Sequence, residues 1–222
     1  HIVMWQASNL QHSTGKPWRY TPEQLRFVLW WYAVTPDLRW VYRDGVLQRL
    51  KGWGKDPVAA TLSATEFVGP CRPDKSSRTV RDPWGNEHPA GVPHPEAWVQ
   101  IAAVSKDQTR NTMTLFPALF TKAAIKRYSI DLGKEIIYAH KGAQRIEAVT
   151  SSPRALEGGR PTFTLRNEPH HWLSNNEGHE MDAVIDRNAV KSADGMSRPL
   201  SITNAYEPGE DSVAERARDA YD

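Results

Sequence analysis

The chain of 222 residues is 39% hydrophobic and 24% charged, which suits one α/β domain with a sizeable core. No stretch approaches eighteen uninterrupted apolar residues, and the N-terminus lacks the pattern of a secretory signal, so neither a membrane-spanning helix nor a leader is predicted. The single cysteine, Cys71, excludes an intramolecular disulfide and any zinc site with two cysteine ligands. A reducing, intracellular setting is therefore expected.

The net charge of +2 conceals an uneven distribution. Residues 1–55 and 111–166 each carry an excess of five basic residues, whereas 167–222 carries an excess of seven acidic ones. Such segments can face polyanions and basic partners, but a normally solvated surface explains the same pattern and is favoured from charge alone.

The first nineteen residues are predicted to be an N-terminal extension to a domain that covers residues 20–222. His1-Ile2-Val3 precede the first methionine, Met4, and are expected to be a cloning remnant outside the fold. Residues 69–95, rich in proline, glycine and charge, are predicted to form a long surface loop or hairpin.

The first half of the domain is predicted to contain two helices with paired strands between them. Thr21-Pro22-Glu23-Gln24 has the pattern of a capping box, and the apolar spacing after it predicts a helix to about Val34 that is buried on several sides. Residues 39–43 and 46–50 are predicted to pair as a hairpin about Asp44-Gly45. A loop at residues 52–55 then leads into a helix that Asp56-Pro57 begins and that extends to about residue 68.

The second half alternates strands with helices. Strands are predicted at residues 98–104, 144–149, 161–165 and 200–203, and helices at about 106–119, 178–193 and 210–221. Because several of these strands are apolar enough for burial on both faces, the pattern predicts an α/β fold with a largely parallel sheet covered by helices.

The segment Lys51-Gly52-Trp53-Gly54-Lys55-Asp56 lies between an apolar strand and a helix that starts with proline. A glycine loop there can turn its backbone N–H groups toward phosphate oxygens, with Lys55 as a positive charge for the outer phosphates. The usual P-loop spacing has glycine at position 49 and serine or threonine at position 56, where this chain has Arg49 and Asp56. By itself the segment is equally typical of a glycine-rich turn before a capped helix.

A later strand, Pro161 to Leu165, leads into Arg166-Asn167-Glu168. In P-loop ATPases such a strand ends in two acidic residues, the first for the Mg²⁺ shell and the second to orient and deprotonate water. Glu168 suits the second role, while Asn167 offers a neutral oxygen for the first. An edge strand that runs into a polar loop is the alternative, and Arg166 is unexpected inside a buried strand.

Two further segments have candidate roles. The strand Pro199-Leu200-Ser201-Ile202 ends at Thr203-Asn204, in the position where such enzymes sense the γ-phosphate, although an ordinary strand end has the same pattern. The side-chain amide of Gln24 is able to pair with adenine, although its capping role explains it equally well.

Taken together, these segments resemble the ATPase domain of the large subunit of tailed-phage terminases, over roughly residues 20–216. The segments that carry the resemblance are residues 26–32, Gln48-Arg49-Leu50-Lys51-Gly52-Trp53-Gly54-Lys55-Asp56-Pro57, residues 98–105, 107–112 and 156–163, Asn167-Glu168-Pro169-His170-His171-Trp172, and Ile202-Thr203-Asn204-Ala205. Their joint order is far more specific than any one of them.

The resemblance implies a P-loop, RecA-like three-layer domain that hydrolyses ATP with Mg²⁺. It assigns ATP-binding roles to these positions: Gln24, Lys51, Gly52, Trp53, Gly54, Lys55 and Asp56. It assigns the catalytic glutamate to Glu168, Mg²⁺ contacts to Asp56 and Asn167, and coupling to Thr203 and Asn204. The family stabilises the transferring phosphoryl group with an arginine, for which Arg154 and Arg160 are the candidates. The family has serine or threonine at position 56 and mostly aspartate at position 167.

The partners that the resemblance implies are double-stranded DNA, the phage portal, the small terminase subunit and other copies of the chain in a ring. The isolated domain is expected to be monomeric or weakly associated and to lie in the host cytoplasm, docking transiently on the procapsid. Complete members of the family carry a nuclease domain after the ATPase, which is not expected in a chain that ends at Asp222. The rival hypothesis is a nucleotide-binding module without turnover, motivated by Asn167 and Asp56, and a DNA-binding module that uses no nucleotide is a third.

His170-His171 and His179-Glu180 invite a zinc hypothesis. Adjacent histidines on an extended segment point in opposite directions, and the second histidine of a zincin helix is missing. We therefore expect these residues to pack beside Glu168 or to face solvent.

Overall fold

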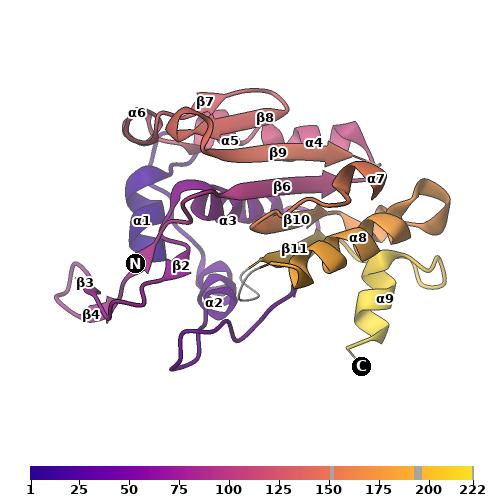
Figure 1. Cartoon of the computed structure of the whole chain (residues 1–222), viewed down its shortest axis with the longest axis horizontal. Coiled ribbons are helices and arrows are strands. Elements are labelled where there is room, and N and C mark those ends of the chain that lie inside the picture. Colours follow the sequence, from indigo (N-terminus) through magenta and orange to yellow (C-terminus); the bar gives the residue numbers. More distant parts are fainter. Residues whose placement is uncertain (151–152, 193–196, 222) are drawn as a thin grey trace.

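The computed structural model describes residues 1–150, 153–192 and 197–221, without the side chains of Arg154 and Ala155. Within this part of the chain, a seven-stranded sheet forms the centre of the molecule (Figure 1). The order of its strands is β1 (Gly45–Gln48), β11 (Arg198–Thr203), β10 (Phe163–Asn167), β6 (Trp98–Ala103), β9 (Gln144–Thr150), β8 (Ile136–Ala139) and β7 (Asp131–Leu132). The first five strands in this order, β1, β11, β10, β6 and β9, run parallel to one another. The last two, β8 and β7, extend the sheet in antiparallel pairing. The predicted α/β class is confirmed.

Helices cover both faces of the sheet and bury its apolar strands (Figure 1). On one face α3 (Lys55–Val68) packs against the central strands, with α4 (Lys106–Met113) beside it. This layer also contains α1 (Ile2–Asn9), α2 (Pro22–Trp31), α5 (Phe116–Leu119) and α6 (Lys122–Tyr128). The opposite face carries α7 (Pro153–Leu156), α8 (Gly178–Val190) and α9 (Val213–Asp219), which share a smaller apolar cluster around Trp172. None of the helices in the described ranges is long and apolar enough to cross a bilayer.

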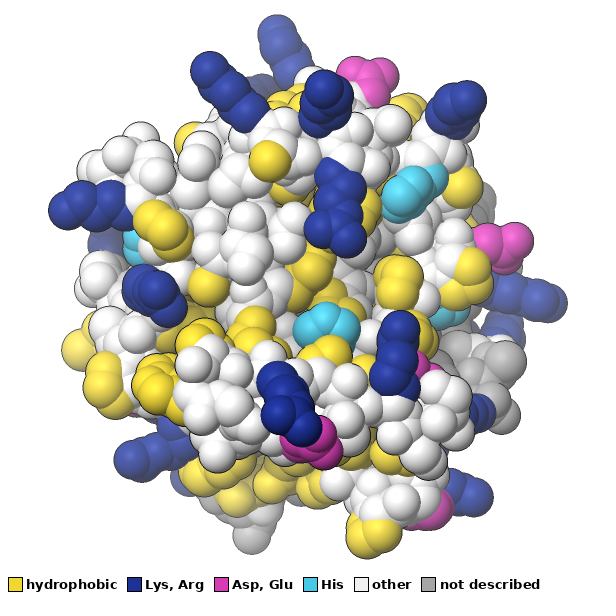
Figure 2. Space-filling view, turned by 90° about the vertical axis from the view of Figure 1, so that its left-hand side faces the viewer, with side chains coloured by type: hydrophobic (Ala, Val, Ile, Leu, Met, Phe, Trp, Pro, Cys, Tyr) yellow, Lys and Arg dark blue, Asp and Glu magenta, His cyan; other side chains and the backbone are white. Residues whose placement is uncertain are grey.

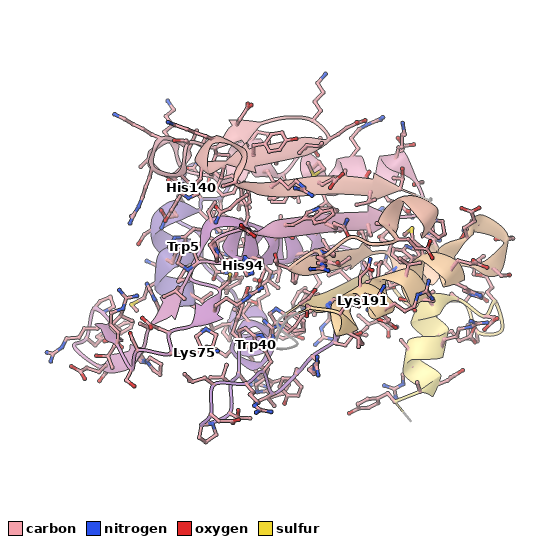
Figure 3. The ribbon with its side chains drawn as sticks, viewed as in Figure 1. Trp5, Trp40, Lys75, His94, His140 and Lys191 are labelled. Atoms are coloured by element: carbon pink, nitrogen blue, oxygen red, sulfur yellow. The ribbon has the colours of Figure 1, made fainter. Side chains whose placement is uncertain are left out.

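The first residues of the chain pack onto this domain. Ile2 and Val3, expected to lie outside the fold, belong to α1, and the ring nitrogen Nδ1 of His1 accepts from the N–H of Gly91 at 3.0 Å. Trp5, labelled in Figure 3, lies on the same helix and is buried. Its indole N–H donates to the hydroxyl of Tyr128 at 2.8 Å. Helix α1 thus joins the layer of α3 and α6 through polar as well as apolar contacts.

The prediction of a hairpin about Asp44-Gly45 is wrong. Strand β1 starts at Gly45 and pairs in parallel with β11. A Cβ atom at Gly45 would lie 2.7 Å from the ring of Trp31, so the glycine allows the strand to approach α2. Asp44 forms an ion pair with Arg166 at 3.0 Å instead of directing a turn. A dipeptide typical of turns here begins a parallel strand at the edge of the sheet.

Helix α2 has the predicted capping box but ends at Trp31 and is not buried all round. Leu29 and Trp30 are 58% and 60% exposed, whereas Trp31 is buried. The helix predicted over 106–119 is two helices, because Pro117 lacks an N–H and helix α5 begins around it.

The predicted surface loop at 69–95 contains two small antiparallel pairs, β2 (Arg72–Pro73) with β5 (Gly91–Val92) and β3 (Thr79–Arg81) with β4 (Glu87–Pro89). Cys71 and Arg72 at its start are buried. The strands β7 and β8 and the helices α1, α6 and α7 were also not predicted from the sequence.

Candidate nucleotide-binding site

The loops that follow β1 and β10 meet at one edge of the sheet, because these strands run parallel and end on the same side. Lys55, the first residue of α3, lies with its Nζ 3.9 Å from Oε1 of Glu168. The phosphate-loop segment and the strand-end carboxylate therefore share one site, as the sequence requires if a single nucleotide is to contact both.

Two glycines in the left-handed region shape the loop before α3. Gly52 and Gly54 have φ angles of +90° and +89°, which strain any residue with a Cβ. Gly54 is the N-cap of α3, and no described side chain caps this helix. The first N–H groups of α3 are thus available to a phosphate, with the helix dipole adding positive potential beside Lys55.

The start of α2 holds this loop from outside. Glu23 accepts from the indole N–H of Trp53 at 2.8 Å and pairs with Arg49 at 2.8 Å. The amide of Gln24 accepts from the N–H of Thr21 at 3.1 Å and donates to the carbonyl of Trp53 at 3.2 Å. The predicted adenine-reading residue lies at the rim of the loop with its amide already engaged by the protein. The roles of Glu23 and Arg49 were not predicted.

Glu168 has an unusual backbone and converging contacts. Its φ of 56° and ψ of 54° are in the left-handed region, which is sparsely populated by residues other than glycine and is common at functional sites. Its N–H donates to the carbonyl of Ile202 at 2.8 Å, and its Oε1 accepts from Nδ2 of Asn204 at 3.1 Å. The predicted catalytic and coupling residues are therefore in direct contact.

Asn167 is buried at the end of β10 and is fixed by α4. Its Nδ2 donates to the carbonyl of Gln108 at 2.9 Å and to the hydroxyl of Thr112 at 3.0 Å. Since a carbonyl only accepts, this bond also fixes which atom of the amide is nitrogen. Its Oδ1 is buried and has no hydrogen-bond partner among the described residues. One oxygen of Asn167 is thus left for a ligand.

The two adjacent histidines lie on the same side of Glu168. Residues 169–171 form a 3₁₀ helix, so the expectation that the rings point in opposite directions is wrong, and their centroids are 3.9 Å apart. Nδ1 of His170 is 2.9 Å from the hydroxyl of Thr203. Burial, His171 and Lys55 together lower the pKa of His170 to about 4, which leaves this ring neutral at pH 7.

Arg166 belongs to the opposite face of β10. Its buried guanidinium pairs with Asp44, with Asp182 at 2.7 Å and with Asp186. These carboxylates come from the start of β1 and from α8, which explains the arginine inside the strand. A groove of about 1040 Å³ lies beside this cluster, between β1 and α9.

The remaining predicted residues are less constrained. Lys51 and Arg160 are exposed, and Asp56 is half-buried with a carboxylate oxygen 3.8 Å from Nζ of Lys55. The backbone of Arg154 lies in α7, but its side chain is outside the described residues. The geometry brings Lys55, Asp56, Glu168 and Asn204 together and leaves the arginine of the family's mechanism unassigned.

A parallel sheet with a glycine loop, a buried lysine at a helix N-terminus and a strand-end glutamate defines the fold class of the P-loop ATPases. No protein-family model matches the chain. The chain is 48% identical over 206 residues to the Gene 13 protein of Mycobacterium phage L5, covering 90% of this chain and 33% of that protein. It thus spans about a third of the length of this relative.

The comparison with solved structures specifies the fold further. The large terminase of bacteriophage HK97 matches with a TM-score of 0.65 at 14% identity, over 100% of this chain and 41% of that chain. A variant of the large-terminase ATPase domain of Thermus phage P74-26 matches with a TM-score of 0.50 at 10% identity, over 84% of this chain and 65% of that one. The chain has the fold of the ATPase domain of phage large terminases, as its motifs predicted.

Proposed function

We propose that this chain is the ATP-hydrolysing motor domain of a phage large terminase and that it drives double-stranded DNA into the capsid. The observation that carries the proposal is the 3.9 Å approach of Lys55 to Glu168, two groups far apart in sequence. The terminase fold and the uncapped glycine turn before α3 support the same conclusion.

In this proposal the chain holds the triphosphate and positions water. Lys55 and the first N–H groups of α3 bind the outer phosphates, with Lys51 at the start of the same loop. Glu168 orients the attacking water and accepts its proton. Catalysis then consists mainly of positioning and of charge stabilisation.

The residues present fit a Mg²⁺ ion. Hard divalent cations prefer oxygen ligands, and the buried Oδ1 of Asn167 lacks a partner in the described chain while the carboxylate of Asp56 lies beside Lys55. These two residues would hold the ion, directly or through its waters. The ion supplies neutralisation of the phosphate charge that develops during transfer.

In this proposal, two contacts between the ends of β10 and β11 couple the γ-phosphate to the position of Glu168. Asn204 donates to Glu168, and Thr203 bonds His170 in the helix after Glu168. A shift at the end of β11 on loss of the γ-phosphate therefore changes the position of Glu168, and conversely. We propose this linkage as the first step of force transmission.

The surface offers positive charge for DNA phosphates. Figure 2 shows the face at the left of Figure 1, where Lys and Arg side chains are spread widely and acidic ones are few. The α6 cations, defined here as Lys122, Lys126 and Arg127, are exposed on a single short helix. DNA contact of this kind is independent of sequence and sensitive to salt. The portal, the small subunit and further copies in a ring are the other proposed partners, with the isolated chain a monomer in the host cytoplasm that docks on the procapsid.

The test is ATP turnover with Mg²⁺, measured as phosphate release. Glu168→Gln should abolish turnover while ATP still binds, and Lys55→Ala should weaken binding itself. Glu180→Gln, an exposed change in the first turn of α8, is the matched control and should behave as wild type. Wild-type turnover that survives Glu168→Gln would refute the assignment of the base.

The rival is a nucleotide-binding module without turnover, favoured by Asn167 and Asp56 in place of the usual metal ligands. It predicts ATP binding without phosphate release in the wild type. A DNA-binding module without nucleotide predicts no thermal shift with ATP and unchanged DNA affinity in Lys55→Ala.

A further inference from the structure

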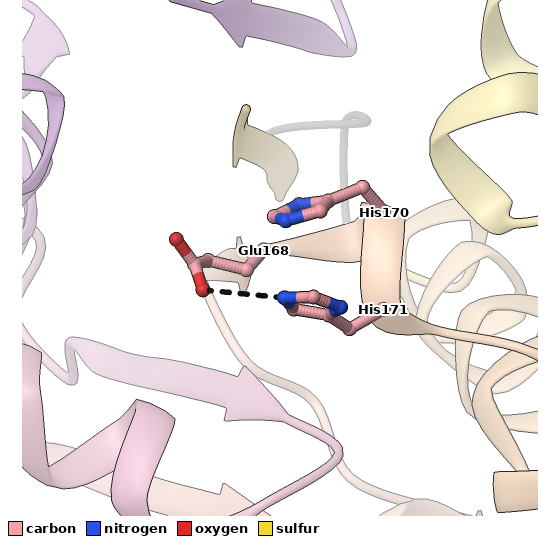
Figure 4. A group of neighbouring side chains, drawn as sticks. All are labelled: Glu168, His170 and His171. Carbon is pink, nitrogen blue, oxygen red and sulfur yellow. Dashed lines mark ion pairs between the residues drawn. The ribbon is translucent and has the colours of Figure 1, made fainter. Parts of the chain in front are cut away.

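Glu168, His170 and His171 form a cluster in which one ligand atom from each residue lies within 4.8 Å of the others (Figure 4). Nε2 of His171 is 4.0 Å from Oε2 of Glu168, the carboxylate oxygen that Asn204 does not use. The imidazole rings lie side by side with an interplanar angle of 39°. All three side chains converge on one small volume at the end of β10.

Two imidazoles and one carboxylate are a typical ligand set for a divalent transition metal. Zn²⁺ bonds of about 2.0–2.2 Å place tetrahedral ligand atoms roughly 3.3 Å apart, so the cluster needs only a small closure to enclose an ion. Mg²⁺ and Ca²⁺ prefer oxygen ligands and gain little from imidazoles. The cluster therefore favours Zn²⁺ or Co²⁺ over the ion that accompanies ATP.

Hydrogen bonds hold the backbone of the cluster and the residues that lie behind its histidines. The N–H of His171 donates to the carbonyl of Glu168 at 3.0 Å, and the buried indole of Trp172 donates to the carbonyl of Asn167 at 3.1 Å. Where Nδ1 of His170 donates to the hydroxyl of Thr203, its Nε2 keeps a lone pair for a metal. The side chain of His171 is 55% exposed, so an ion can reach the cluster from solvent.

We propose that Glu168, His170 and His171 bind a divalent transition metal such as Zn²⁺, and that the bound ion withdraws Glu168 from water activation. The first part stands on the cluster alone, and the second rests on the proposed function. Oε2 of Glu168 would ligate the ion while Oε1 stays with Asn204 and Lys55. The metal thereby inhibits the motor through its base, without occupying the phosphate loop.

The test uses the untagged chain without nucleotide and Co²⁺ as the probe. We expect one equivalent to bind with the visible absorption of a tetrahedral site, and Zn²⁺ to displace it. His171→Ala should lower the affinity at least tenfold, as should Glu168→Gln, whereas Mg²⁺ in excess should not compete. The matched control is His140→Ala, an exposed histidine beside β8 outside the cluster, which should bind Co²⁺ as wild type does.

Because His171 is exposed, its alanine variant is expected to fold, and an unchanged thermal midpoint verifies this. Co²⁺ affinity that is equal in wild type and His171→Ala, or no binding to either, overturns the proposal. The measurement needs no turnover, so it succeeds or fails independently of ATP hydrolysis. If the chain hydrolyses ATP, Zn²⁺ should inhibit the wild type and His140→Ala alike and should inhibit His171→Ala less, and equal inhibition of all three would overturn the inhibitory role of the cluster.

Discussion

Replacing Asn167 by aspartate, the residue that the terminase family mostly has, should destabilise this chain in the absence of metal. Asn167 uses its Nδ2 to donate to the carbonyl of Gln108 and to the hydroxyl of Thr112. An aspartate cannot donate when ionised, and its oxygen would face the Gln108 carbonyl at the present 2.9 Å. The substitution converts an attractive contact into a repulsion between two acceptors.

The magnitude follows from the burial of the site. A buried acceptor left unsatisfied costs about 1–3 kcal/mol, and a buried carboxylate without a partner adds to this. We expect Asn167→Asp to lower the free energy of unfolding by about 2–3 kcal/mol. For a chain of this length that corresponds to a fall in Tm of about 4–12 °C.

The assay is thermal and denaturant unfolding with chelator and then with Mg²⁺. Asn111→Asp, an exposed change on α4, is the control and should stay within about 0.5 kcal/mol of wild type. Mg²⁺ should restore part of the loss in Asn167→Asp and little in the control, because the ion supplies the partner that the carboxylate lacks. Equal Tm values for wild type and Asn167→Asp with chelator would refute the role of α4 in fixing this amide.

Three further results are expected. Glu66→Gln should lower the free energy of unfolding by about 3–5 kcal/mol, measured by denaturant unfolding. The carboxylate of the buried Glu66 lies 2.5 Å from the guanidinium of Arg72 and 3.7 Å from that of Arg198, so its loss leaves two buried cations without a carboxylate partner. A loss below about 1 kcal/mol would contradict this. Burial raises the pKa of Cys71 to about 12, so a thiol reagent at pH 8 should react only after unfolding, and rapid labelling of the folded chain would show that the site opens. Alanine at the three α6 cations should weaken DNA binding and reduce the slope of log affinity against log salt concentration by roughly 2–3. The control Lys191→Ala should change this slope by no more than about 1.

Most of the fold was predictable because its signals are local. Thr21-Pro22-Glu23-Gln24 forms the predicted capping box, and the apolar run at 98–104 is a central strand. The hairpin failed because the role of Asp44-Gly45 depends on partners distant in sequence. Asp44 pairs with Arg166, and Gly45 packs against Trp31. No local pattern contains that information.

The part of the site that depends on the order and direction of the strands could be predicted from the sequence. Parallel strands place Lys55 and Glu168 at one edge, and order along the chain is enough to infer this. Two features depend on side-chain geometry and could not be inferred in this way: the hydrogen bond from the indole of Trp53 to Glu23, and the close approach of the His170 and His171 rings. The pattern Asn-Glu-Pro-His-His contained a signal for the latter, since proline at 169 favours a turn over an extended strand.

We propose that Asp56 and Asn167 exchange the ligand types of the two positions to which the terminase resemblance assigns Mg²⁺. Relative to the family, the carboxylate has moved from the strand end to the helix start, and a neutral oxygen has moved the opposite way, so the charge of the pair is preserved. If both residues hold Mg²⁺, Asp56→Ser alone should reduce the gain in nucleotide affinity on adding Mg²⁺ about tenfold, and adding Asn167→Asp should restore part of it. The measurement is a double-mutant cycle on nucleotide affinity with and without Mg²⁺, below the Tm of every variant. Strictly additive effects would mean that the two positions do not share an ion.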